Sequence, residues 1–229
     1  MRALQNDVQE IYLLPSLKGT PLEELARQKK VPVHYKSRSF FEVFAQGGIH
    51  QGVAACLLPF PYASLQSVME KNADWLLILD GIVDPRNLGA LLRTAEAVGV
   101  GGVILPQRRS ASLSPLVEKA AAGAVAYLPI CQVENLARAL VLIREAGYWL
   151  IGLAPHTHQT LYDVGLSGKI AFLLGGEEKG LRSLTQRYCD FLVSIPMVGK
   201  IESLNVSVAG GIVLYEFLRR KLAKDTKDS

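Results

Sequence analysis

The sequence lacks the features that would place the protein outside the cell or in a membrane. Its 229 residues include three cysteines, Cys56, Cys131 and Cys189, which are odd in number and far apart. This spacing indicates neither a disulfide framework nor a zinc site, and we interpret the thiols as small buried side chains in a reducing cytosol. No signal peptide opens the chain, and charges interrupt every apolar run before it reaches membrane-spanning length. We therefore expect a cytoplasmic protein without a membrane partner or a metal.

Two common nucleotide-binding motifs are also missing. In the glycine-rich stretch 175–180, Lys179 precedes Gly180, whereas a P-loop needs Gly-Lys followed by Ser or Thr. No early strand is followed by G-x-G-x-x-G, which argues against an ordinary Rossmann dinucleotide or methyltransferase site. The formal net charge is +4. This mildly basic balance is compatible with a nucleic-acid partner without identifying one.

Residues 1–58 are predicted to form a small α/β unit. Apolar runs predict strands at 8–14, 31–35 and 52–58. Thr20 with Glu23, and Ser39 with Glu42, match the capping box that starts a helix, so helices should follow Thr20 and Ser39. Two prolines, Pro59 and Pro61, break regular structure. We place the domain boundary there, with 59–72 as a linker whose second half, 63–72, is a short helix.

Strands and helices alternate in the remaining region, 73–229. Strands are predicted at 75–79, 102–105, 126–130, 148–153, 170–174 and 191–195. Helices are predicted around 88–98, 113–122, 133–146 and 181–188, and in a closing segment that ends near 222. This order predicts a parallel sheet with helices on both sides. The closing helix is amphipathic, and its apolar stripe consists of Leu204, Val208, Ile212, Tyr215 and Leu218.

Three loops at the carboxyl ends of predicted strands have the composition of a binding site, because parallel sheets bind ligands at that edge. In the first, Asp84 can cap a helix that begins at Pro85, and Asn87 and Arg93 lie off its apolar stripe. Arg93 is available for an anion, although solvated surface arginines are common. The second loop is 175–180, whose glycines allow close approach to a ligand, or simply form a turn.

The third loop, 195–207, leads into the closing helix. Ser203, Asn205 and Ser207 gather where that helix starts, and both residue types are favoured as N-caps. Together the three loops resemble the motifs of the SpoU (TrmH-type) family of RNA ribose 2'-O-methyltransferases, in the knotted SPOUT superfamily. The resemblance rests on Asp84-Pro85-Arg86-Asn87-Leu88-Gly89-Ala90 with Arg93-Thr94-Ala95, on Leu174-Gly175 with Glu177 and Gly180-Leu181, and on Ile195-Pro196-Met197 with Gly199 and Ser203-Leu204-Asn205-Val206-Ser207.

The resemblance covers about residues 75–220 and implies a fold and a cofactor. It implies a trefoil knot at the carboxyl end that gathers the three loops into one pocket for S-adenosylmethionine. By position, the pocket residues would be Gly175, Ile195, Leu204, Met197 and Gly199. Ser203 and Asn205 would border the methyl-transfer site. The family also implies a homodimer, with the target nucleotide near the subunit junction.

Arg93 is the residue that the resemblance implies for activating the ribose 2'-hydroxyl. Because arginine stays protonated at ordinary pH, we interpret it as a cation that holds the adjacent phosphate and the nascent alkoxide. Asn87 and Glu177 would orient Arg93 and the ribose. Orientation of two reactants can supply roughly 7–11 kcal/mol, whereas general acid–base help gives about 10²–10⁴-fold, so positioning should dominate.

The RNA partner is expected to be ribosomal. Residues 1–58, which end in His50-Gln51-Gly52-Val53, resemble the ribosomal-protein-like RNA-binding domain of the ribosomal-RNA members. Six basic side chains could contact phosphates as a group, although each alone would be a solvated charge: Arg108, Arg109, Lys29, Lys30, Arg38 and His50.

The favoured reaction is 2'-O-methylation of a guanosine in large-subunit ribosomal RNA. A transfer-RNA substrate is the first alternative, and an antibiotic-resistance methylase of the same architecture is another. A third is a non-catalytic RNA-binding or ribosome-assembly factor on a decayed scaffold. The joint retention of the five proposed catalytic side chains argues against decay: Asn87, Arg93, Glu177, Ser203 and Asn205.

Overall fold

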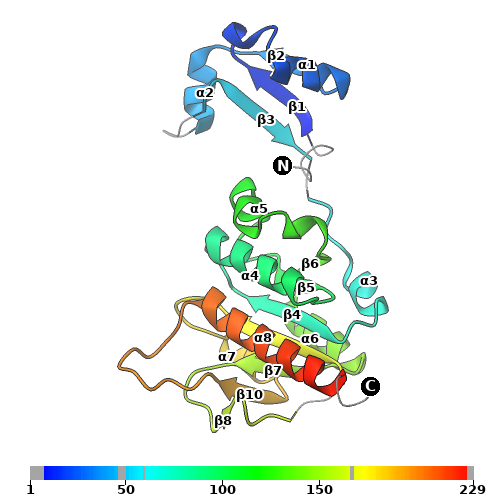
Figure 1. The fold of residues 1–229 in the computed structure, drawn as a ribbon, viewed down its shortest axis with the longest axis vertical. Coiled ribbons are helices and arrows are strands. Elements are labelled where there is room, and N and C mark those ends of the chain that lie inside the picture. The colour runs from blue at the N-terminus through cyan, green and yellow to red at the C-terminus, as the bar shows by residue number, and fades with distance from the viewer. Residues whose placement is uncertain (1–7, 46–49, 59, 166–167, 226–229) are drawn as a thin grey trace. The chain divides into compact units, whose positions relative to one another are not determined.

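The computed structural model of the chain describes residues 8–45, 50–58, 60–165 and 168–225. Their contacts divide the chain into two units, with the division between Pro61 and Tyr62. Each unit is described by itself (Figure 1). Pro59, which helped to place the predicted boundary, and the tail 226–229 lie outside the described residues. No helix in the described ranges combines the length and the apolarity that crossing a bilayer requires.

The first unit alternates strands and helices as predicted. Its three-stranded sheet has the order β2-β1-β3, in which β1 runs parallel to β2 and antiparallel to β3. Ile11, Leu13 and Ala26 form its buried core. The elements are β1 (Val8–Leu13), a 3-10 turn (Pro15–Leu17), α1 (Pro21–Gln28), β2 (Val33–Tyr35), α2 (Arg38–Ala45) and β3 (Val53–Leu57).

The two predicted capping boxes are wrong in detail, although both helices exist. Thr20 occupies the N-cap position of α1, but its hydroxyl donates to the carbonyl of Leu17 and caps no helical N–H. Helix α2 begins at Arg38, so Ser39 lies inside its first turn. Local side chain–backbone bonds in Ser and Thr compete with capping, and sequence spacing alone does not decide between them.

The second unit contains a seven-stranded sheet in its described part, and every strand pair in it is parallel. The strand order is β6-β5-β4-β9-β7-β10-β8. The strands are β4 (Trp75–Asp80), β5 (Val103–Pro106), β6 (Ile130–Val133), β7 (Trp149–Leu153), β8 (Gln159–Thr160), β9 (Ile170–Gly175) and β10 (Phe191–Ser194). The prediction of a parallel-sheet α/β unit is confirmed.

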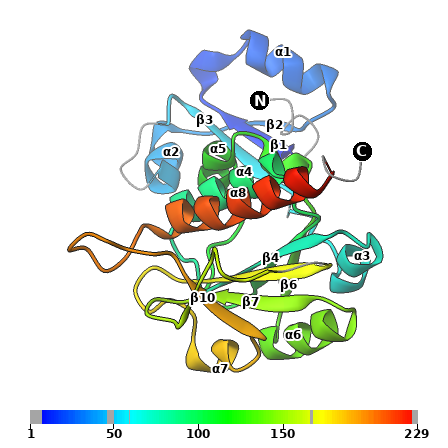
Figure 2. The same ribbon diagram turned by 60° about the horizontal axis from the view of Figure 1, so that its bottom comes forward.

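Helices cover both faces of this sheet. Helices α4 and α8 lie on one face, and α6 and α7 lie on the other (Figure 2). The helices are α3 (Leu65–Glu70), α4 (Pro85–Ala97), α5 (Pro115–Ala121), α6 (Leu136–Glu145), α7 (Ser183–Gln186) and α8 (Val206–Asp225). Every residue of β4 and β9 is buried, as expected for strands covered on both sides.

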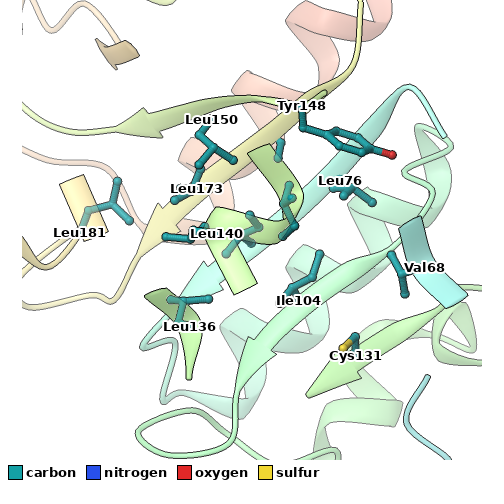
Figure 3. Packing of buried hydrophobic residues seen from close by; sticks show 13 residues of the cluster. Val68, Leu76, Ile104, Cys131, Leu136, Leu140, Tyr148, Leu150, Leu173 and Leu181 are labelled. Carbon is teal, nitrogen blue, oxygen red and sulfur yellow. The ribbon is translucent and has the colours of Figure 1, made fainter. Parts of the chain in front are cut away.

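The core on the α6 side joins the sheet to α3 and α6. Leu76, Ile104, Leu140 and Leu173 meet there, and all are less than 1% exposed (Figure 3). Alternate residues of the same strands point to the opposite face. On that face the ring of Phe172 from β9 lies 4.3 Å from the ring of Phe217 from α8, measured between centroids. The sheet is therefore fixed between two helical layers.

Two further predictions are wrong. The strand predicted at 126–130 is displaced, because Ala124–Ala126 form a 3-10 turn and β6 begins only at Ile130. The turn follows Ala122 and Gly123, both of which have left-handed backbones. The cysteines also differ from expectation, since Cys131 is buried but Cys56 and Cys189 are only half-buried.

The apolar stripe assigned to the closing helix is also wrong. Helix α8 begins at Val206, so Leu204 precedes it, and Val208 and Tyr215 are 51% and 55% exposed. The buried face is Ala209, Val213, Leu214 and Phe217. Apolar side chains surround this helix on all sides, so periodicity does not determine which stripe faces the sheet.

A carboxylate on α8 holds the helix to the segment before β9. Glu216 accepts hydrogen bonds from Arg219 and from Arg220, and these bonds, with that from Arg219 as the larger cause, lower the pKa of Glu216 to about 2. Arg220 in turn donates to the carbonyl oxygens of Leu161 and Tyr162, at 2.9 and 3.1 Å. One carboxylate thus orients the arginine that fastens residues 161–162 to the helix.

We predict that Glu216→Gln removes part of the acid sensitivity of the second unit. A carboxylate whose pKa is lowered on folding stabilises the fold above its unfolded pKa, near 4.5, and loses that contribution as pH falls toward about 2. Both tryptophans, Trp75 and Trp149, lie in this unit, so their fluorescence reports its unfolding. The wild-type free energy of unfolding should fall more steeply than that of the variant between pH 5 and pH 2.5. Parallel curves would contradict the assignment.

Candidate active site

Side chains from three distant segments meet beside the start of α4. The Nδ2 of Asn87 donates to Oε1 of Glu177 at 2.9 Å, and the Nδ2 of Asn205 donates to Oδ1 of Asn87 at 3.0 Å. Glu177 lies in the loop after β9, and Asn205 lies just before α8. Hydrogen bonds therefore join the three loops that the sequence singled out. We call these three residues the amide relay.

The carboxylate of Glu177 fixes the direction of the whole relay. An ionised carboxylate only accepts hydrogen bonds, so the NH₂ group of Asn87 must face Glu177 and its oxygen must face away. That oxygen needs a donor, which is the NH₂ group of Asn205, so the oxygen of Asn205 points toward α8. The orientation of each amide is assigned by this network. Asn87 is 9% exposed, so water does not easily replace its partners.

Two helix starts lie beside the relay. Oδ1 of Asn205 accepts from the backbone N–H of Ser207 at 2.9 Å and from its hydroxyl at 2.6 Å, and so it caps α8. At α4, Asp84 accepts from the N–H of Arg86 at 2.8 Å, and Pro85 occupies the first helical position. The cap predicted for Asp84 is confirmed, and of the three residues expected near the start of the closing helix, Ser203, Asn205 and Ser207, Asn205 is the N-cap.

Close backbone packing shapes the loop between β9 and α7. A side chain at Gly175 would overlap the backbone of Gly180, and one at Gly176 would overlap the carbonyl oxygen of Gly81. The N–H of Gly176 donates to the carbonyl of Asp80 at 3.0 Å, which ties this loop to the end of β4. The glycines at 175 and 176 are thus required by the fold of the loop itself.

A buried acid that the sequence analysis missed anchors the same loop. Asp80, at the end of β4, is 1% exposed and accepts from the Nε of Arg182 at 3.0 Å and from the hydroxyl of Thr185 at 2.6 Å. Arg182 also pairs with the second carboxylate oxygen. The sequence does contain a signal for this residue, because Asp80 directly follows a continuous apolar strand. An acid in that position is expected to be buried and therefore to need partners.

Arg93 lies apart from the amide relay within one chain. Its side chain is exposed and makes no ion pair or hydrogen bond with a residue in the described ranges. Six helical positions separate it from Asn87, which corresponds to about 9 Å along the axis and about 120° around it. Asn87 therefore orients Asn205 directly, Glu177 acts on Asn205 only through Asn87, and no hydrogen bond among the described residues connects either of them to Arg93.

The remaining predicted residues lie in or beside the segment between β10 and α8. Ser203, Leu204, Met197 and Gly199 are exposed, and Ile195 is half-buried. This segment extends away from the sheet in both views (Figures 1 and 2). None of the backbone groups of residues 196–204 is hydrogen-bonded to another described residue. They remain available to a ligand.

The basic residues predicted on the first unit are only partly available. Lys30 is exposed, Lys29 is exposed but already interacts with another group, and Arg38 pairs with Glu42 at 3.3 Å. The Nδ1 of His50 accepts from the N–H of Gly52 at 2.9 Å, which gives that side chain a structural role. The described ranges contain no group of three or more His, Cys, Asp or Glu placed to hold a metal.

A different surface of the first unit combines aromatic rings with a cation. The ring of Tyr12 lies 5.1 Å from that of Phe40 and 5.5 Å from that of His34. The Nζ of Lys36 lies 5.9 Å from the Tyr12 ring and 5.6 Å from the Phe40 ring. Rings and cations of this kind suit stacked bases and phosphates. Tyr12 on β1 lies beside His34 on β2 because of the register between these two strands. The sequence alone does not give that register, so this surface could not have been inferred from it.

Two family models match the chain. The SpoU rRNA Methylase family matches residues 74–215, and a model described as RNA 2'-O ribose methyltransferase substrate binding matches residues 1–63. The chain is 40% identical over 225 residues to the 23S rRNA (guanosine-2'-O-)-methyltransferase RlmB of Pseudomonas putida, covering 95% of this chain and 90% of that protein. It is 38% identical over 220 residues to RlmB of Escherichia coli K12, covering 93% and 90%.

Solved structures show the same fold. The AdoMet-bound rRNA methyltransferase from Sinorhizobium meliloti superposes with a TM-score of 0.73 at 25% identity, covering 94% of this chain and 81% of that one. The SpoU methyltransferase AviRb from Streptomyces viridochromogenes, in complex with AdoMet, gives a TM-score of 0.72 at 24% identity, covering 94% and 84%. The second likeness concerns the fold alone.

Substitutions at Asn205 should separate its two roles. Asp retains an acceptor for the α8 cap but cannot donate to Asn87, whereas Ala does neither. We expect Asn205→Ala to speed hydrogen exchange of the Ser207 and Val208 amides by about 2- to 30-fold, the equivalent of a lost N-cap, and Asn205→Asp to preserve their protection.

Both variants should shift the side-chain amide resonances of Asn87, because both remove its donor. NMR of the full chain reads both effects in one sample. Unchanged Asn87 amide signals in Asn205→Asp would rule out the relay, and lost protection of Ser207 in that variant would rule out the separate cap.

Proposed function

The chain belongs to the SpoU rRNA methylase family, and on that premise we propose that it methylates the 2'-hydroxyl of a guanosine in 23S ribosomal RNA. It is an RNA 2'-O-ribose methyltransferase that uses S-adenosylmethionine, as the resemblance implied. The RlmB relatives are 23S rRNA guanosine enzymes by name and match most of the chain. They favour ribosomal RNA over the transfer-RNA alternative. The bacterial origin of these rRNA-modifying relatives supports a cytoplasmic location for this enzyme.

The amide relay is the observation that carries the proposal. It brings side chains from all three motif segments to one place, and an intact relay is unnecessary for a decayed scaffold that only binds RNA. A polar group left unpaired after losing a buried partner costs about 1–3 kcal/mol. The relay therefore supports an assembled site and argues against the non-catalytic alternative.

The segment 195–205 fits the cofactor. Its free backbone groups can bind the adenosyl part, while exposed apolar side chains such as Leu204 and Met197 can cover the ring. We propose that Gly175, Ile195, Leu204, Met197 and Gly199 hold S-adenosylmethionine, which supplies the sulfonium methyl group. Ser203 and Asn205 border the methyl-transfer position. The relay holds Asn205, and through it the start of α8, against this position.

Arg93 is proposed to stabilise the developing alkoxide. The ribose oxygen loses its proton as it attacks, and a guanidinium that donates to this oxygen and to the neighbouring phosphate lowers the barrier without taking the proton. The exposure of its side chain, and the lack of an ion pair or hydrogen bond from that side chain to any described residue, support this role. Because Glu177 orients Asn87 and Asn87 in turn accepts from Asn205, we assign Asn87 and Glu177 to positioning the cofactor loop and not to positioning Arg93.

We also propose a trefoil knot and a division of labour between the units. Strand β9 is inserted between β4 and β7, and α8 returns to pack on α4, as a chain that threads its own loop requires. A side chain at Gly210 would overlap Leu91 of α4, so the two helices approach closely. Residues 1–58 are the proposed RNA-binding domain and 73–229 the catalytic domain, joined by 59–72. The substrate-binding family model supports the first assignment.

The homodimer remains a proposal, and the exposed face of α8 supports it. Val208, Tyr215 and Leu222 are each more than half exposed and lie on one side of this helix. A second copy of the chain would cover them and would place the target nucleotide near the subunit junction. Large apolar side chains grouped on one surface commonly mark an interface.

We predict that Arg93→Ala cuts single-turnover methylation of a 23S rRNA transcript by at least ~100-fold and leaves the S-adenosylmethionine dissociation constant nearly unchanged. Leu204→Glu should instead weaken the binding of S-adenosylmethionine, and calorimetry measures this change. Arg187→Ala, which removes an exposed arginine from the end of α7, is the matched control. Normal turnover by Arg93→Ala would remove this residue from the mechanism, and an unchanged dissociation constant in Leu204→Glu would refute the assigned pocket.

Tyr215→Glu should convert the dimer to a monomer. A carboxylate in the covered interface would lose its hydration without gaining a partner. Sedimentation equilibrium of the wild type, of this variant and of Val141→Glu measures the effect. Val141 is an exposed apolar residue on α6, on the opposite face of the sheet, and serves as the control. A wild-type monomer, or a dimer that survives Tyr215→Glu, would contradict the proposed interface.

A further inference from the structure

A cavity of about 240 Å³ lies on the α6–α7 side of the second unit, and no residue of the amide relay lines it. Its wall includes Arg108 and Arg109 from the loop after β5, Arg182 at the start of α7, and Glu134 with Asn135 at the start of α6. None of the ten predicted catalytic and cofactor residues lines it. We propose that this cavity binds a backbone phosphate of the RNA substrate, and the proposal rests on the RNA methyltransferase function above.

Arg182 is held in place for such a ligand. Its Nε and one terminal nitrogen donate to Asp80, which is fully buried. A guanidinium has five N–H donors, so three remain for another acceptor. The side chain of Arg182 is 43% exposed, so those donors are accessible. The buried carboxylate thus orders the Arg182 side chain before a ligand binds, which lowers the entropic cost of binding at the cavity wall.

Arg108 and Arg109 supply two further cations that have no described partner. Neither makes an ion pair or a hydrogen bond with a described residue, whereas Arg144, Arg182, Arg219 and Arg220 of the same unit all do. Their loop is nevertheless ordered at both ends. The N–H of Gln107 donates to Val133, and the N–H of Ala111 donates to Ile82, both at 2.8 Å.

The backbone of Arg109 points to a function for this loop. Its φ is +62°, a left-handed conformation that arginine rarely adopts. A strained residue held by its surroundings often marks a binding site. Glycine or asparagine would be the ordinary choice for this turn, so a side chain with a charged head is retained at a conformational cost. Phosphate recognition is the task for which arginine is suited.

The charge and size of the cavity favour a phosphate over a larger ligand. Three arginines and one acid, Glu134, line the cavity, and Asp80, which pairs with Arg182, neutralises part of the remaining positive charge. Ligand pockets for drug-sized molecules span roughly 300–1,000 Å³, so a cavity of 240 Å³ suits a phosphate with part of its sugar. It does not suit a second complete cofactor.

The position of the cavity favours RNA as the source of that phosphate. Arg182 directly follows the 175–181 loop, and Arg108 follows the strand next to β4, so the cavity lies at the same carboxyl edge of the sheet as the motif loops. An RNA strand that delivers its ribose to those loops can continue along this edge. Phosphate contacts of this kind fix the register of the strand and leave base choice to other groups.

Salt dependence of RNA binding tests the proposal. The variants are Arg108→Ala and Arg109→Asn, because asparagine tolerates a left-handed backbone. Each should weaken the binding of a 23S rRNA transcript roughly three- to tenfold at moderate salt, and should reduce the slope of log affinity against log salt by about 0.7–1. Arg138→Ala removes the same charge from α6 outside the cavity and should leave the slope unchanged.

Three further measurements separate the possible failures. The dissociation constant of S-adenosylmethionine, and single-turnover methylation at saturating RNA, should match the wild type in both cavity variants. If the wild type methylates the transcript but the cavity variants bind RNA with the slope of Arg138→Ala, the inference fails and the proposed function stands. If the wild type transfers no methyl group, the proposed function fails. Tight calorimetric binding of inorganic phosphate, with unchanged RNA affinity in the variants, would identify a free-anion site and overturn the RNA assignment.

Discussion

The carboxamide of Asn87 is the contact on which the site depends. Its NH₂ group donates to Glu177, 90 residues away in the sequence, and its oxygen accepts from Asn205, 118 residues away. The two partners belong to different segments. Because Asn87 is nearly buried, its polar atoms lose water on folding and must recover those bonds within the protein. A single side chain therefore couples the loop after β9 to the first turn of the closing helix.

A second buried group, Asp80, performs the corresponding task on the other side of the loop. The register of β4 with β9 sets the start of the loop beside Asp80, and the bonds from Arg182 and Thr185 hold its end. The loop is thus fixed at both ends, while the following segment 195–205 has backbone groups free for a ligand. This combination of fixed loop and open segment is what a preorganised cofactor site needs.

Much of this arrangement was predictable from local patterns. Strand–helix alternation identified the parallel sheet, the cap at Asp84 identified the start of α4, and the cluster Ser203, Asn205 and Ser207 located the start of α8 to within a few residues. Tertiary choices were not predictable in the same way. The buried stripe of α8 depends on which of two apolar faces meets β9, and the start of β6 depends on the turn at Ala122 and Gly123. The partners of Asp80 and the arginine cavity arise from segments whose contact no local spacing records.

The most direct test of the central claim is a double-mutant cycle for S-adenosylmethionine affinity with Asn87→Ala, Asn205→Ala and the pair. If one side chain couples the two segments, removing the second residue from a chain that already lacks the first should cost less than removing it from the wild type. We expect a coupling free energy of about 0.5–3 kcal/mol in calorimetric dissociation constants. Effects that add to within about 0.3 kcal/mol would contradict the claim that this amide assembles the site.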